Sequence, residues 1–259
     1  MSQLENADLI YEQRVRIEMQ RWRESMLRGP GMLGWASGRL QAKINSFIPE
    51  KVHAAVTATI KQMTQGVLTG SEWVSSLPVV QGSLATRERL AKQKIEAYRT
   101  TAAVEGGVAG AGGFMLSLAD FPMLLGIKLK LLFDLANVYG YSTSQLSERL
   151  YLLQIFQLAF SSQQHRRKIF LEVDAWHLKL DALPKSLDDF DWRTYQQEYR
   201  NYIDLAKLVQ LIPVIGAPVG AIVNYKLIEQ LGETARNAYR LRWFQSSQVA
   251  AIPADIHQG

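Results

Sequence analysis

Residues 102–120, AAVEGGVAGAGGFMLSLAD, form a run of small residues between segments with helical patterns. Glycine inside a helix costs about 0.5–1 kcal/mol relative to alanine, so this concentration of glycine needs a compensating gain. Small residues spaced by four line one face of a helix and allow a second backbone to approach closely. Two such pairs and one further glycine occur here: Gly106 and Gly110, Gly107 and Ala111, then Gly113. The run therefore predicts close helix–helix packing.

A second apolar segment, LVQLIPVIGAPVGAIVNY at 208–225, repeats the spacing in Gly216 and Gly220, after Pro213. Two faces of small residues fit each other closely. We therefore expect the glycine face of residues 106–113 to lie against the helix that carries Gly216 and Gly220.

Neither segment has the pattern of a membrane-spanning helix, which needs about 18–20 consecutive apolar residues. The first has 14 uncharged residues between Glu105 and Asp120. The second is interrupted by Gln210, Asn224 and two prolines. The pattern favours two buried helices packed against each other, with shallow or re-entrant membrane insertion as the alternative.

Apolar residues recur at steps of three to five along most of the chain, without an alternating strand pattern. This predicts an all-α fold, a multi-helix bundle with the two glycine-rich helical hairpins packed in its centre. Helices are expected at about 10–26, 32–47, 49–70, 83 into the glycine run, 121–139, 144–160, 163–178, 192–211 and 214–244. We divide the chain into basic amphipathic N-terminal helices (1–48), a helical domain (49–244) and a flexible tail (245–259).

Composition excludes several kinds of chemistry. The 259 residues include no cysteine, which rules out disulfides, thiolate metal sites and cysteine catalysis. The four histidines show no metal-ligand spacing, and the glycine run lacks the strand and the GK[ST] of a phosphate-binding loop. Basic residues at 87–94 alternate with glutamate and lack interleaved aromatic residues, so we expect no nucleic acid partner. We expect no metal and no cofactor.

The N-terminal helices carry the pattern of interfacial helices, in which basic and aromatic residues accompany an apolar face. Basic residues next to an anionic membrane contribute about 1 kcal/mol each. Glu12, Glu18 and Glu24 dilute the charge, so a plain surface helix is the alternative. The residues assigned to a membrane or partner surface are Arg14, Arg16, Arg21, Trp22, Arg23, Trp35, Arg39 and Lys43.

Two phrases occur in this order. The first is EGGVAGAGGF with an aspartate soon after and an apolar helix that ends in LANVYGY at 135–141, and the second is the block at 208–244. Together they resemble the EcsC family. The similarity covers about residues 50–244 and leaves the first 45 residues and the tail unmatched. The family-like positions are Gly106, Gly107, Gly110, Gly113, Asp120, Tyr139, Gly140, Pro213, Gly216, Gly220 and Asn224.

The resemblance implies a role but no chemistry. The family is named for a protein encoded beside a bacterial ABC transporter, and its members have no settled activity. Most of the family-like positions here are glycines and prolines, which shape the backbone. Only Asp120 and Asn224 offer side chains with chemistry.

Asp120 has two interpretations. It precedes Phe121 and Pro122, a pattern in which the carboxylate caps the following helix and proline occupies its first turn. It could instead be an exposed carboxylate that serves as a general base or cation ligand. The sequence favours the cap.

Two classes of function follow. The first is a non-enzymatic, cytoplasmic protein of bacterial origin, peripheral at the inner face of the membrane, that contacts anionic lipid or an ABC transporter. The second is a hydrolase that acts on a lipid-like substrate in a cleft between the glycine-rich hairpins, with Asp120 and Asn224 as its catalytic candidates. The sequence favours the first class.

Overall fold

The computed structural model describes residues 3–28, 50–69, 78–79, 81–111, 120–186, 188–189 and 217–250. Within these ranges the prediction of an all-α fold is confirmed. The elements are α1 (Gln3–Leu27), α3 (Glu50–Thr69), α4 (Leu84–Ala111), α6 (Phe121–Tyr139), α7 (Leu146–Phe160), α8 (Gln163–Asp174), α9 (Trp176–Lys179), the 3-10 turn η1 (Leu180–Ala182) and α12 (Ala217–Ala250).

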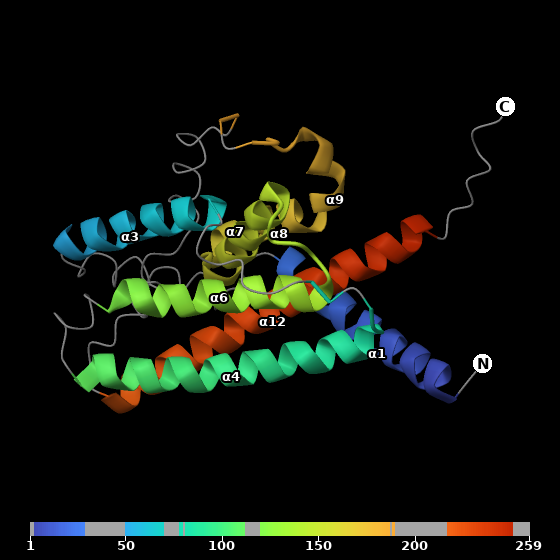
Figure 1. Ribbon diagram of the computed structural model, residues 1–259, viewed down its shortest axis with the longest axis horizontal. Coiled ribbons are helices and arrows are strands. Elements are labelled where there is room, and N and C mark those ends of the chain that lie inside the picture. Colours follow the sequence, from blue (N-terminus) through green and yellow to red (C-terminus); the bar gives the residue numbers. More distant parts are fainter. Residues whose placement is uncertain are drawn as a thin grey trace.

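The two longest helices, α4 and α12, pack against each other in opposite directions along most of their length (Figure 1). Three contacts along the pair set the antiparallel register: Glu88 with Arg236, Ile95 with Gly232, and Gly106 with Gly220. The glycine-rich end of α4 therefore lies beside the first turns of α12.

Helix α6 lies against both members of this pair. Its start follows the predicted signal, since Phe121 is buried and Pro122 stands in the first turn, where proline is tolerated. Its end is set by Gly140, whose φ of 91° is left-handed and costs glycine nothing. The N–H of Gly140 donates to the carbonyls of Ala136 and Asn137, so the last turn is satisfied.

The core extends from these three helices to α7, almost all of whose side chains are buried. The rings of Tyr139 and Tyr239 stack at 5.0 Å between centroids, and Tyr151 meets Tyr239 edge-on at 5.7 Å. Helices α3, α7 and α8 lie on one side of the long helices, and α1 crosses near the C-terminal half of α12 (Figure 1). The side chains of Val15 and Met19 join α1 to the common core.

Some helix boundaries differ from the predicted ones. The helix expected at 163–178 ends at Asp174, and a turn at Ala175 starts the short α9 with a buried Trp176. Helix α12 continues to Ala250, past its predicted end at Phe244, so the first part of the expected tail is helical. The helices expected at 32–47 and 192–211 lie outside the described residues.

Candidate functional site

Exposed aliphatic side chains occur near the end of α4 and near the starts of α6 and α12. Val104 and Val108 on α4 are 62% and 63% exposed, Ile222 on α12 is 56% exposed, and Met123 on α6 is 47% exposed. The antiparallel register of α4 and α12 brings these helix ends together, on the left in Figure 1. We call these four residues the apolar end.

The glycine contact lies in the same region of the bundle. A Cβ added to Gly106 would stand 2.6 Å from the carbonyl oxygen of Gly220 and 2.6 Å from Nδ2 of Asn224. Only hydrogen fits at Cα here, so the two backbones approach as the small-residue spacing predicted for this pair. Gly107 is half-buried in α4, and Gly110 lies in its last turn. Gly113, Pro213 and Gly216 lie outside the described residues.

A fully buried lysine, Lys128 of α6, faces this contact. Its Nζ donates to Oδ1 of Asn224 at 2.9 Å and to the carbonyl of Leu124 at 3.1 Å. Asn224 is itself fully buried and donates from Nδ2 to the carbonyl of Gly220 at 3.2 Å. Among the described residues, no carboxylate lies within ion-pair distance of Lys128. Burial disfavours its charged form and lowers its pKa to about 7.

Asn224 was among the residues predicted from the sequence, but Lys128 was not. A signal was present, because Lys128 follows Leu124 by four residues and precedes Leu131 and Leu135 on the apolar stripe of α6. A lysine on such a stripe is either buried or at a helix end, where it reaches water. The sequence does not decide between these, because the asparagine that receives its hydrogen bond is 96 positions away.

Asp120 differs from its predicted role. It occupies the N-cap position of α6, but its side chain makes no cap hydrogen bond. Its backbone, with φ −82° and ψ −8°, is helical, whereas a capping residue is normally extended. The predicted side-chain cap is therefore wrong, and the carbonyl of Asp120 simply accepts from the N–H of Leu124.

At the other end of the α4–α12 pair, charged side chains are buried in pairs. Glu88, fully buried, accepts from Arg236 at 2.5 Å, from Arg240 at 2.7 Å and from the hydroxyl of Tyr139 at 2.5 Å. Burial alone would raise the pKa of Glu88, but the hydrogen bond of Arg240 and the charges of both arginines hold it below its usual value. These basic residues thus serve the fold.

A second buried pair joins α7 to α12. Arg242 binds Glu148 at 2.7 Å, and its guanidinium carbon lies 3.6 Å from the ring centroid of Tyr141 and 4.6 Å from that of Tyr151. Glu148 also accepts from the hydroxyl of Tyr239 at 2.6 Å. The arrangement locks the C-terminal half of α12 and presents no charge to solvent.

Two residues of α1 that we assigned to a membrane or partner surface contact other helices of the protein. Trp22 packs edge-on against Phe170, with 5.3 Å between ring centroids. Arg23 binds Asp174 of α8 through Nη2 at 2.7 Å and through Nε at 3.1 Å. Both side chains fasten α1 to α8.

The other assigned residues of α1 are exposed. The guanidinium carbon of Arg16 lies 4.5 Å from the ring centroid of Phe244, while Arg14 and Arg21 face solvent. The remaining assigned residues lie outside the described ranges: Trp35, Arg39 and Lys43.

No helix of the described residues combines the length and the apolar character needed to cross a bilayer. No group of three or more His, Asp or Glu side chains in that part of the chain is arranged to hold a metal ion.

Comparison with known proteins identifies the family. The sequence profile of the EcsC protein family matches residues 13–244. The chain belongs to the EcsC family. Protein EcsC of Bacillus subtilis (strain 168) is 44% identical over 226 residues, which cover 87% of this chain and 93% of the relative. The uncharacterized protein YdbA of the same organism is 27% identical over 208 residues, or 79% of this chain and 76% of the relative. No solved structure matches the chain.

The extent of the family match corrects one detail of the sequence analysis. We expected the resemblance to begin near residue 50, but the profile begins at residue 13 and includes most of α1. The packing explains this extent, because Val15 and Met19 of α1 are part of the common core. The N-terminal helix therefore belongs to the family fold.

Proposed function

We propose that this protein is a non-enzymatic, peripheral membrane-binding member of the EcsC family, which inserts its apolar end into one leaflet. The observation that carries the proposal is the exposure of Val104, Val108, Met123 and Ile222 near the ends of three helices that pack against one another. Exposed apolar side chains on a protein surface are typical of membrane and protein interaction sites.

The size of the apolar end sets the strength of the interaction. Full burial of an aliphatic side chain contributes about 1.5–3 kcal/mol, so burying the exposed half of each of the four contributes about 1 kcal/mol per residue. A total of about 4 kcal/mol is below that of a single myristoyl chain, which binds membranes reversibly. We therefore expect reversible attachment.

The proposed insertion differs from the electrostatic docking through α1 that the sequence suggested. Trp22 and Arg23 are engaged with α8, which leaves fewer groups for lipid on that helix. Attachment through aliphatic side chains persists as salt rises, whereas attachment through surface charges weakens. An accessory role beside an ABC transporter at the inner face of a bacterial membrane remains part of the proposal, on the family resemblance alone.

The lipid-hydrolase alternative finds less support. It needs Asp120 and Asn224 in one accessible cleft. Asn224 is fully buried, and both ends of its amide are hydrogen-bonded to protein. Asp120 precedes Lys128, the partner of Asn224, by eight residues, which is about 12 Å along a helix.

The test is flotation with vesicles of phosphatidylcholine and phosphatidylglycerol in a 3:1 ratio. The wild-type chain should float with the vesicles at low and at high salt. Replacing both Val108 and Ile222 with aspartate should abolish flotation without lowering the melting temperature, because both side chains are exposed. A wild-type chain that stays unbound, or a double variant that still floats, would refute the proposal.

Ile17→Asp provides the matched control. Ile17 is an aliphatic residue of α1 with 55% exposure, similar to that of Ile222, but it lies away from the apolar end. We expect this variant to float like the wild type. A selective loss in Ile17→Asp, together with release at high salt, would assign membrane binding to α1 instead.

A further inference from the structure

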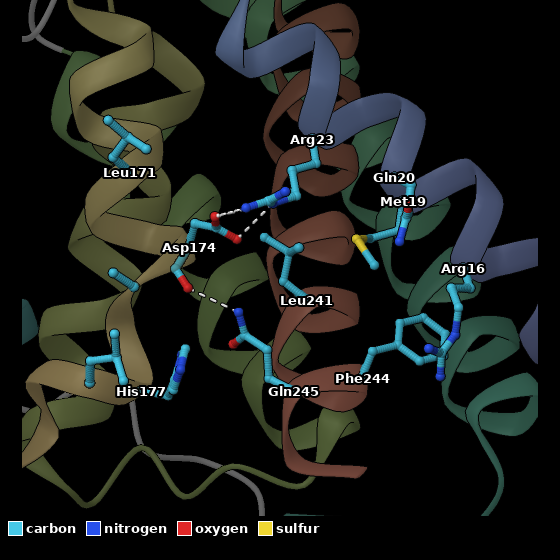
Figure 2. Close-up of a pocket in the computed structure, with 12 residues that line it drawn as sticks. Arg16, Met19, Gln20, Arg23, Leu171, Asp174, His177, Leu241, Phe244 and Gln245 are labelled. Atoms are coloured by element: carbon cyan, nitrogen blue, oxygen red, sulfur yellow. Dashed lines mark hydrogen bonds and ion pairs between the residues drawn. The ribbon is translucent and has the colours of Figure 1, made fainter. Parts of the chain in front are cut away.

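A pocket of about 380 Å³ opens between α1, the corner of α8 and α9, and the C-terminal half of α12 (Figure 2). Its volume falls in the range of small-molecule sites, about 300–1,000 Å³. The pocket lies near the C-terminal half of α12, whereas the apolar end lies near the first turns of that helix. A ligand in this pocket would therefore bind away from the proposed membrane-inserting residues.

Apolar side chains form part of the pocket lining. Met19 of α1 and Leu241 and Phe244 of α12 line it while being only 6%, 3% and 4% exposed. Leu171 lies across from them (Figure 2) and is 46% exposed, and Leu178, which also lines the pocket, is 75% exposed. An aliphatic chain in the pocket would cover both leucines, which water contacts in the free protein.

The polar groups around the pocket leave one unmatched positive charge. Arg23 and Asp174 neutralise each other through their paired hydrogen bonds, and Gln245 donates to the Asp174 carbonyl at 2.9 Å. Arg16 has no carboxylate within ion-pair distance among the described residues. Its guanidinium packs on the Phe244 ring, an arrangement that leaves the N–H groups at its edge available to an acceptor.

We propose that this pocket binds a single-chain amphiphile with a terminal carboxylate, a medium-chain fatty acid in its simplest form. The carboxylate accepts hydrogen bonds from Arg16 at the edge of the pocket. The acyl chain lies over Met19 and Leu241 and against Leu178. Both the charge and the apolar surfaces of the pocket are then matched by one molecule.

Isothermal titration of the full chain with decanoate, below its micelle concentration, tests the proposal. The wild type should bind one decanoate saturably. Arg16→Gln should weaken binding about tenfold or more, because a hydrogen bond between charged groups is lost. Leu178→Asp should also weaken it, since a negative charge replaces an apolar side chain of the pocket lining. Both positions are exposed, so the variants should keep the wild-type melting temperature.

Two controls make the result specific. Arg14→Gln changes an exposed arginine of the same helix that does not line the pocket, and it should bind decanoate like the wild type. Decanol, which has no charge, should bind the wild type and Arg16→Gln alike. Absence of saturable decanoate binding, or equal affinities of the wild type and Arg16→Gln, would overturn the proposal.

Discussion

Replacing Lys128 with methionine should remove a large pH dependence of stability. Burial lowers the pKa of Lys128 from 10.5 to about 7 in the folded chain. Between these two values the unfolded chain binds more protons than the folded one, so the free energy of unfolding rises with pH through this window. At about 1.4 kcal/mol per pH unit, the gain across the window is about 5 kcal/mol.

The structure also sets the effect at a single pH. Methionine has a similar length and carries no charge, so the variant escapes the penalty of burying an ammonium group at neutral pH. It leaves the buried Oδ1 of Asn224 without its donor, which costs about 1–3 kcal/mol. We therefore expect Lys128→Met to be about 2–4 kcal/mol more stable than the wild type at pH 7, and no more stable at pH 10.

Urea unfolding followed by circular dichroism at pH 7, 8, 9 and 10 measures this effect. Lys92→Met, which changes an exposed lysine of α4, is the control and should keep the wild-type slope. Parallel pH profiles of the wild type and Lys128→Met would refute the reasoning, because they would mean that Lys128 has the same pKa in the folded and the unfolded chain.

Three further substitutions test the packing and the charges. Gly106→Ala should lower stability by about 1–3 kcal/mol, since its Cβ would meet the Gly220 carbonyl at 2.6 Å; an unchanged melting temperature would contradict this contact. Glu88→Gln should cost about 3 kcal/mol at pH 7, because Arg236 and Arg240 lose the buried carboxylate that they share and keep only the half-exposed Glu233 and Glu18. The stability difference between the wild type and Glu88→Gln should shrink as pH falls below about 4, where Glu88 becomes protonated. A stability difference that does not change with pH would contradict this. Asp120→Ala and Asp120→Asn should both stay within about 0.5 kcal/mol of the wild-type stability, because no cap hydrogen bond is lost. Destabilisation of Asp120→Ala but not of Asp120→Asn would show that Asp120 caps the helix after all.

Features encoded by near neighbours were readable from the sequence alone. The start of α6 at Phe121 and its end before Gly140 follow from proline tolerance in the first turn and from the left-handed backbone of glycine. The four-residue spacing of Gly106 and Gly110, repeated in Gly216 and Gly220, likewise indicated a close approach of two helices. These signals are local, because each depends on the conformation of a few consecutive residues.

The partners of charged residues were decided by the tertiary structure. Glu88 belongs to a segment of alternating charges that is typical of a solvated helix face, yet packing against α12 buries it between Arg236 and Arg240. Trp22 of α1 fits a membrane-seeking pattern, yet it covers Phe170. A sequence shows which residues share a helix face, but burial and pKa depend on what another helix places opposite that face. For Lys128 that group is Asn224, and only the fold brings the two together.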